Sequence, residues 1–285
     1  MAEPFLLAFD PLTPLPTAER EARLDAYLDF LRQRDGEPDV PARTLSRREA
    51  WFQDIEKKPV RYKGAIDRDA FRKYLTDKKP PRDLDPKLLW LLATAKANRL
   101  EHYGVTLDFA LHGDEVAARF GQHMPFIDLE EFYHTRILRE CVRVFGLEFD
   151  LEPPSSFARF FTTLVVRSPH WGRLVTALCG ELFGSVAFQM LWEKIDLFDD
   201  DPEAAARLRL LVREILIDEM GHAAYGHAML GAGGIATVRA LSPVVSSYFL
   251  SDLPEFAYLV GGKTAFLKRV AAFDLASNER LWATA

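Results

Sequence analysis

Two Glu-x-x-His motifs, Glu131–His134 and Glu219–His222, constrain the fold of this chain more than any other feature. Both lie in stretches with helical periodicity, where residues three positions apart share one face, one turn apart. They are the only such motifs among 7 His. A lone motif is better explained as a surface glutamate near a partly buried histidine. The repetition instead favours a joint role, because carboxylates bridge hard metal ions and imidazole suits iron.

Four long helices are predicted in the central part of the chain, and each Glu-x-x-His motif falls on a different one. Two helices with such motifs and two with a single glutamate can together hold two metal ions in a four-helix bundle. We therefore expect an all-α fold with this bundle as its core. The predicted core helices span residues 86–111, 128–145, 170–197 and 202–230, with a connection over 114–127. We expect Asp128 to cap the second of these helices.

The chain divides into three parts by its helix pattern. We expect residues 1–84 to form a helical arm that packs on the core and has no chemistry of its own. Residues 85–231 hold the metal-binding bundle, and residues 232–285 extend the same domain with further helices. The shorter predicted helices span 17–34, 46–55, 67–75, 238–249 and 254–273.

The turn at residues 199–201 identifies the glutamate that faces Glu219. Helices joined by a short turn come level at equal distances from it. Glu181 lies 18 residues before Asp199, and Glu219 lies 18 residues after Asp201, so the two are level. Glu193 would miss that level by about 18 Å at ~1.5 Å per residue. Glu181 is the predicted ligand, and the alternative is a surface glutamate beside packing glycines.

The fourth carboxylate follows by elimination. Glu101 is the only glutamate of the helix 86–111, although His102 and Asp108 are nearby substitutes. Four carboxylates offset the charge of two divalent ions, which favours a dinuclear site over a single zinc. The predicted ligands are Glu101, Glu131, His134, Glu181, Glu219 and His222.

Three further residues are candidates for supporting roles. A metal-bound histidine usually donates its second ring nitrogen to a carboxylate. Asp218 and Glu130 each precede a motif glutamate, turned toward the neighbouring helix, so each is placed to bind the opposite histidine. Tyr225 lies three residues after His222, on the metal-facing side, as a hydrogen-bonding or oxidisable neighbour or as a core tyrosine.

Composition excludes several classes of protein. A net charge of −6 without a basic stripe argues against a nucleic-acid partner. Cys141 and Cys179 lie far apart in apolar helical contexts, as expected of buried free thiols in a reducing cytoplasm. The start of the chain has no basic segment and contains prolines, unlike a signal peptide. No run approaches the ~20 apolar residues of a membrane span. We expect a soluble cytoplasmic protein without a membrane partner.

The order Glu, Glu-x-x-His, Glu, Glu-x-x-His over residues of about 86–231 resembles the ferritin-like non-haem di-iron carboxylate proteins. These include acyl-carrier-protein desaturases, ribonucleotide reductase small subunits, multicomponent monooxygenases, arylamine N-oxygenases and ferritins. The acidic residue before each motif is most similar to the desaturases. The chain length and the arm are equally similar to the N-oxygenases, whose best-known members have a further metal-binding histidine at the position of Ile215.

The resemblance implies two iron ions, or a manganese–iron pair, that use O2 and an external electron donor, a reductase or ferredoxin. The implied reaction is hydroxylation or N-oxygenation of a small organic or carrier-protein-bound substrate. We expect a phenylalanine-lined pocket for it, with Phe183 and Phe188 among the lining residues. Acyl desaturation, iron handling as a ferroxidase, and a bundle without metal remain alternatives, and formation of a homodimer is left open.

Overall fold

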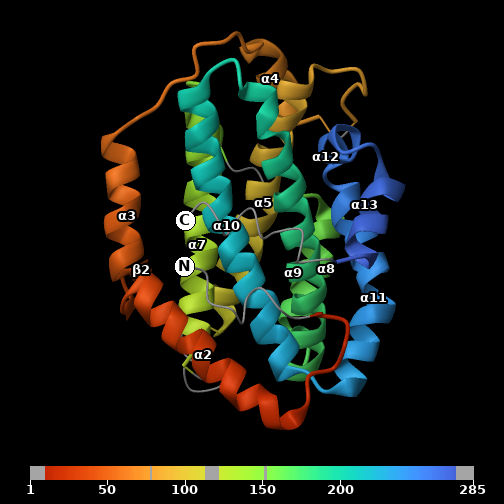
Figure 1. Cartoon of the computed structure of the whole chain (residues 1–285). Coiled ribbons are helices and arrows are strands. Elements are labelled where there is room, and N and C mark those ends of the chain that lie inside the picture. The colour runs from red at the N-terminus through yellow and green to blue at the C-terminus, as the bar shows by residue number, and fades with distance from the viewer. Residues whose placement is uncertain (1–9, 78, 113–121, 151–152, 274–285) are drawn as a thin grey trace.

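Helices dominate the computed structural model, which describes residues 10–77, 79–112, 122–150 and 153–273 (Figure 1). The strands in these ranges are β1 (Pro38–Asp39) and β2 (Thr44–Leu45), a two-residue antiparallel pair. The prediction of an all-α fold is therefore confirmed. Residues 113–121, which form most of the predicted connection, lie outside the described residues.

Four long helices form the centre of the molecule (Figure 1). In the interior α7 packs against both α5 and α10, and α10 packs against α9. The chain continues from α9 into a 3-10 helix, η1 (Lys194–Phe198). The four helices are α5 (Pro86–His112), α7 (Met124–Arg143), α9 (His170–Glu193) and α10 (Pro202–Met229).

The link between α9 and α10 is short and well capped. Asp201 is the N-cap of α10, and its side chain accepts a hydrogen bond from the backbone N–H of Ala204 at 3.3 Å. Pro202 follows in the first turn, where a missing N–H costs nothing. This antiparallel pair brings Glu181 and Glu219 level, as the equal spacing from the turn predicts.

Helix α7 begins earlier than predicted. Asp128 does not cap it, because the helix starts at Met124 with Pro125 in its first turn. A proline there replaces the cap as the start signal, since the first helical N–H groups need no partner within the helix. Asp128 is instead buried inside the helix, with 8% of its surface exposed.

The N-terminal arm consists of α2 (Thr17–Asp35), α3 (Ser46–Lys57) and α4 (Arg68–Leu75). Helix α2 packs on α10, and α4 packs on α5. Phe52 of α3 and Phe71 of α4 are buried in the same hydrophobic core as the four central helices. The arm is thus continuous with the core of the bundle.

Helices α8, α11, α12 and α13 cover the other side of the centre. Helix α8 (Ser156–Val166) precedes α9, and α11 (Ala232–Ser251) lies against α9. Helix α11 starts at Ala232, before the predicted start at residue 238, because the glycines after Leu230 interrupt the helical structure only briefly. Pro243 lies inside this helix. The predicted helix 254–273 is divided into α12 (Pro254–Leu259) and α13 (Lys263–Ala271) by two glycines with positive φ.

The centre of the bundle is strongly apolar. Cys141 and Cys179 are buried and unpaired, as predicted. By length and composition, the stretch His170–Phe198 could cross a membrane, with a mean hydropathy of 1.5 in its most apolar window. The sequence-based expectation that no run approaches a membrane span did not include it. Because 67% of its most apolar window is buried among the other helices, it has the character of a core helix.

Candidate metal centre

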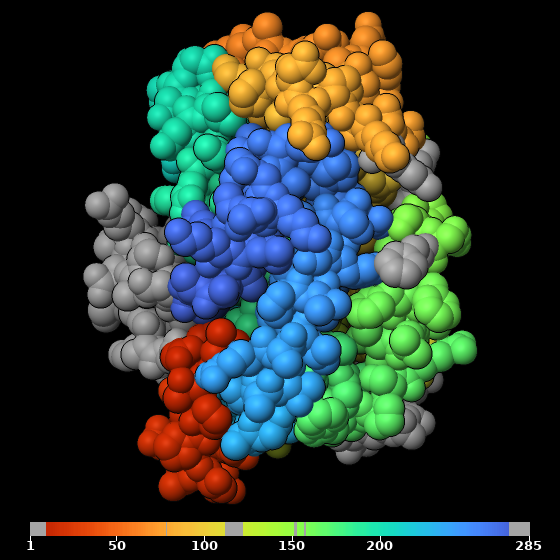
Figure 2. Space-filling model, turned by 90° about the vertical axis from the view of Figure 1, so that its right-hand side faces the viewer, coloured from red at the N-terminus to blue at the C-terminus, as the bar shows by residue number. Residues whose placement is uncertain are grey.

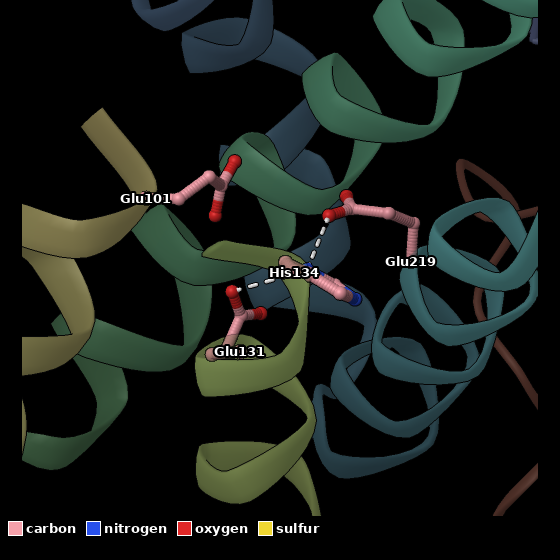
Figure 3. Close-up of side chains that lie close together, drawn as sticks. All are labelled: Glu101, Glu131, His134 and Glu219. Carbon is pink, nitrogen blue, oxygen red and sulfur yellow. Dashed lines mark ion pairs between the residues drawn. The ribbon is translucent and has the colours of Figure 1, made fainter. Parts of the chain in front are cut away.

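The six predicted ligands converge in the middle of the bundle. Figure 3 shows Glu101, Glu131, His134 and Glu219 pointing toward a common space. Each of the four central helices contributes at least one of the six. Glu101 comes from α5, Glu131 and His134 from α7, Glu181 from α9, and Glu219 and His222 from α10.

One half of the cluster is centred on His134. Its Nδ1 atom lies 3.4 Å from Oε2 of Glu131 and 3.5 Å from Oε1 of Glu219. Ligand atoms of these three residues and of Glu101 all lie within 4.8 Å of one another. Three helices thus supply one compact set of donors for a metal ion.

The other half is centred on His222. Its Nδ1 atom lies 3.1 Å from Oε1 of Glu131 and 3.4 Å from Oε2 of Glu181. These three residues form a second group within the same 4.8 Å limit. Glu131 therefore belongs to both groups, with one carboxylate oxygen toward each histidine, which is the position of a bridging ligand.

The outer nitrogen of each histidine is bound by the carboxylate of the neighbouring helix. Nε2 of His134 lies 3.0 Å from Oδ2 of Asp218, and Nε2 of His222 lies 2.9 Å from Oε2 of Glu130. Both carboxyl groups are fully buried. The structure thus places Asp218 and Glu130 against the opposite histidines, where the sequence analysis expected them.

These hydrogen bonds leave each inner nitrogen without a partner. A carboxylate only accepts, so Nε2 carries the hydrogen, and a neutral ring then presents a lone pair at Nδ1. Nδ1 of His134 and of His222 are buried without a hydrogen-bond partner and face carboxylate oxygens. Lone pairs and carboxylates repel unless a cation lies between them. The donor set therefore fits two metal ions.

The pKa values of the buried groups in the cluster show the same need for positive charge. Burial and the neighbouring carboxylate of Glu131 raise the pKa of Glu101 well above its usual range. Burial, with Glu181 next to it, does the same for Glu219. Burial alone would lower the pKa of His134, but Glu131 and Asp218 outweigh it and raise that pKa. These raised pKa values follow from burying several carboxylates close together, an arrangement that a cation stabilises.

Two arginines from the arm hold the outer carboxylates, which the sequence analysis did not anticipate. Arg34 of α2 contacts Asp218 and lies 3.2 Å from Glu130. Arg48 of α3 contacts the second oxygen of Asp218 and lies 3.5 Å from Asp35. The arm, expected to have no chemistry of its own, thus contributes two side chains that contact the carboxylates behind the histidines. In the sequence these arginines are indistinguishable from surface charges, because Glu130 lies 96 residues from Arg34 and Asp218 lies 170 residues from Arg48.

The substitutes considered for Glu101 lie outside the two donor groups found among the described residues. Asp108 forms an ion pair with Arg173 at 3.6 Å. His102 is partly buried, and burial, with Arg139 nearby, lowers its pKa. Glu101 is thus the residue of α5 that joins the cluster.

Tyr225 lies on the metal-facing side of α10, beside His222. The two residues and Glu181 line a cavity of about 190 Å³. The tyrosine ring is tilted against that of His123, with centroids 5.2 Å apart. Burial, with Asp128 nearby, raises the pKa of Tyr225 to about 12, so its hydroxyl keeps its proton at neutral pH.

A larger, mostly apolar cavity of about 320 Å³ borders the carboxylates. Phe183 and Phe188 are among its lining residues, as expected. Glu101, Glu131, Glu181 and Glu219 form its polar end, and the two cavities share lining residues that include Glu181. The cluster therefore lies at one end of a mostly apolar cavity.

No family model, curated protein or solved structure matches this chain. The functional conclusion therefore rests on the chemistry of its own residues.

Gly184 provides a direct test of how closely the helices must approach at the centre. A Cβ atom at this position would overlap the carboxylate of Glu219. We expect Gly184→Ala to fold, because only the end of a flexible side chain must move, but to bind metal about 10- to 100-fold more weakly. Competition with a chelator of known affinity measures this change. Gly180→Ala, where a Cβ atom meets nothing within 4 Å, is the matched control.

Proposed function

We propose that this chain is a ferritin-like di-iron oxidoreductase that uses O2 to hydroxylate or N-oxygenate an organic substrate. The observation that carries the proposal is the pair of buried histidines whose Nδ1 atoms face carboxylates, with Glu131 between them. The order of ligands along the chain supports the ferritin-like assignment, since each central helix supplies the residue type expected of it.

The cluster has the donors that iron favours. His134 and His222 would each bind one ion through Nδ1, Glu131 would bridge them, and the remaining carboxylates would complete the set. Two iron ions held there would supply the redox chemistry needed to activate O2 for attack on a C–H or N–H bond. Manganese in one of the two positions is compatible with the same donors.

The protein's own residues orient the ligands and exclude water. Asp218 and Glu130 fix the rings of the two histidines, so that both Nδ1 atoms point inward. The apolar wall that includes Phe183 and Phe188 would hold the substrate against the carboxylates and keep bulk water away. Burial, with Asp108 nearby, raises the pKa of Asp128 to about 8, so this cavity-lining group holds a proton at neutral pH.

The apolar cavity favours an organic substrate over iron itself. A ferroxidase or iron store needs a polar path for ions, whereas the space beside these carboxylates is lined mainly by aliphatic and aromatic side chains. Acyl desaturation uses the same type of site and remains the alternative reaction. We expect electrons from an external reductase or ferredoxin, because the chain has only 2 Cys and no glycine-rich nucleotide loop.

Anaerobic reconstitution followed by O2 tests the proposal. We expect about two iron ions per chain, followed after mixing with O2 by a transient visible absorption that decays without further iron uptake. Glu181→Ala, which removes a ligand of the His222 group, should lose the transient absorption. Protein that binds no iron would refute the proposal, and iron that accumulates far beyond two per chain would indicate a ferroxidase instead.

A further inference from the structure

Helices α8 and α11 lie on the face of the molecule that Figure 2 shows. Large apolar side chains of both helices are exposed. Phe160 and Leu164 of α8 are 66% and 58% exposed, and Val244 of α11 is 65% exposed. Trp171, in the first turn of α9, is 55% exposed. Several large apolar side chains exposed on one face indicate an interaction site, whereas single exposed apolar residues are ordinary on protein surfaces.

Two printed contacts show that α8 and α11 lie side by side. Ser155, the N-cap of α8, donates a hydrogen bond to Asp252 at 3.0 Å. The rings of Phe161 and Tyr248 lie 4.4 Å apart. Helix α8 therefore runs antiparallel beside α11, and residues that follow Ser155 come level with residues that precede Asp252. Leu164 and Val244 are thus at similar heights on adjacent helices.

The opposite side of α8 lines the large cavity. Thr162, Val165 and Val166 belong to the wall of the 320 Å³ cavity, about half a turn of helix away from Phe160 and Leu164. A single helix therefore separates the exposed apolar surface from the chamber beside the carboxylates. A molecule that arrives at this surface has only α8 and its neighbours between it and the proposed active site.

The charged side chains of α8 and of its C-cap residue are arginines, and Asp252 at the end of α11 is an acidic neighbour. Residues 153–180 and 231–251 contain no Asp or Glu, although the chain as a whole has a net charge of −6. Arg159 and Arg167 are exposed there, and neither forms an ion pair within the described residues. Exposed apolar side chains flanked by cations are typical of a protein surface that binds an anionic lipid surface.

We infer that the α8–α11 face docks on an anionic lipid surface, and that the substrate is a lipophilic molecule that enters the cavity from the bilayer. The second half of this inference rests on the proposed function, but the docking itself does not. No membrane partner was expected, because no membrane-spanning segment was predicted. A protein that docks on the surface of a bilayer needs no such segment. A second copy is a poorer occupant, because a two-fold contact would place like charges together.

Vesicle co-sedimentation of the full chain tests the docking. We expect binding to vesicles of phosphatidylcholine with phosphatidylglycerol, and much weaker binding to phosphatidylcholine alone. The double variant Phe160→Ser/Leu164→Ser should reduce the partition coefficient by roughly tenfold or more. Arg159→Glu/Arg167→Glu should have a comparable effect on the anionic vesicles only.

All four side chains are exposed, so the fold is retained. Leu210→Ser, at an exposed leucine of α10, is the control and should bind as the wild type does.

The metal centre and the docking can be tested separately. Glu181→Ala should bind vesicles like the wild type even if it has lost metal, so a failure of the proposed function would leave the docking intact. The inference is overturned if the wild type stays in the supernatant with anionic vesicles, or if both double variants bind as it does. A dimer that Phe160→Ser/Leu164→Ser dissociates would also overturn it, because a second copy would then cover this surface.

Discussion

Glu131→Ala is expected to remove both metal ions, the largest effect of any single ligand substitution. The other ligands of the two donor groups belong to one group each, but Glu131 belongs to both and directs one oxygen toward each histidine. Its loss leaves each group one donor short and removes the charge between the two ions. Metal analysis after anaerobic loading should find well below about one ion per chain, compared with about two for the wild type.

Two comparisons make this result specific. Glu181→Ala removes a ligand of the His222 group only, so it should retain roughly one ion per chain. Glu203→Ala removes a glutamate of α10 whose side chain is 64% exposed, and it should load like the wild type. If Glu131→Ala and Glu181→Ala lose the same amount of metal, the bridging role assigned to Glu131 is wrong.

Arg48→Ala should lower the free energy of unfolding by about 3–5 kcal/mol, because it removes one of the two cations that compensate the buried carboxylates. The Arg48 side chain is 2% exposed, and its partners Asp35 and Asp218 are fully buried. Denaturant unfolding of the metal-free protein measures this change. Metal affinity should also fall, by about 10- to 100-fold, since Asp218 holds the ring of His134.

The matched control is Arg72→Ala, which breaks an ion pair with Asp69 on the exposed surface of α4. Such a pair contributes about 0–1 kcal/mol, so its loss should scarcely change stability. If Arg48→Ala is no more destabilising than Arg72→Ala, the arm does not brace the metal centre.

The same network should make the protein sensitive to acid. Burial alone would raise the pKa of Asp218, but Arg34 and Arg48 hold it well below its usual range. A carboxyl group with a depressed pKa in the folded state stabilises the fold above its unfolded pKa and loses that contribution as the pH falls. Removing Arg48 should therefore reduce the stability difference between neutral and acidic pH.

Much of the candidate site follows from helical spacing. A glutamate and a histidine three residues apart share a face wherever a helix forms. Each motif therefore predicted two side chains that point to the same side of one helix. Glu181 was identifiable because the α9–α10 turn is short, which makes position along one helix predict position on the other. The same reasoning placed Asp218 and Glu130 beside the opposite histidines. Glu101 followed by elimination among the residues of one helix.

Other features have no such local rule. Arg34 and Arg48 meet Asp218 only because α2 and α3 pack across α7 and α10, and nothing in the arm marks them as buried. The start of α7 at Met124 was missed because a proline in the first turn took the place of the expected Asp128 cap. The exposed apolar surface depends on how α8 lies beside α11, which hydrophobic spacing along either helix does not reveal.

The sequence alone therefore determined the helices and the six side chains that face one another, because helical periodicity and a short turn act over one or two elements. The tertiary structure decided which helix covers which, and so determined the arginines behind the histidines, the shape of the apolar chamber and the surface beside it. Those features depend on contacts between segments far apart in the chain. Each such contact arises from the packing of whole helices and leaves no pattern in the residues near either partner.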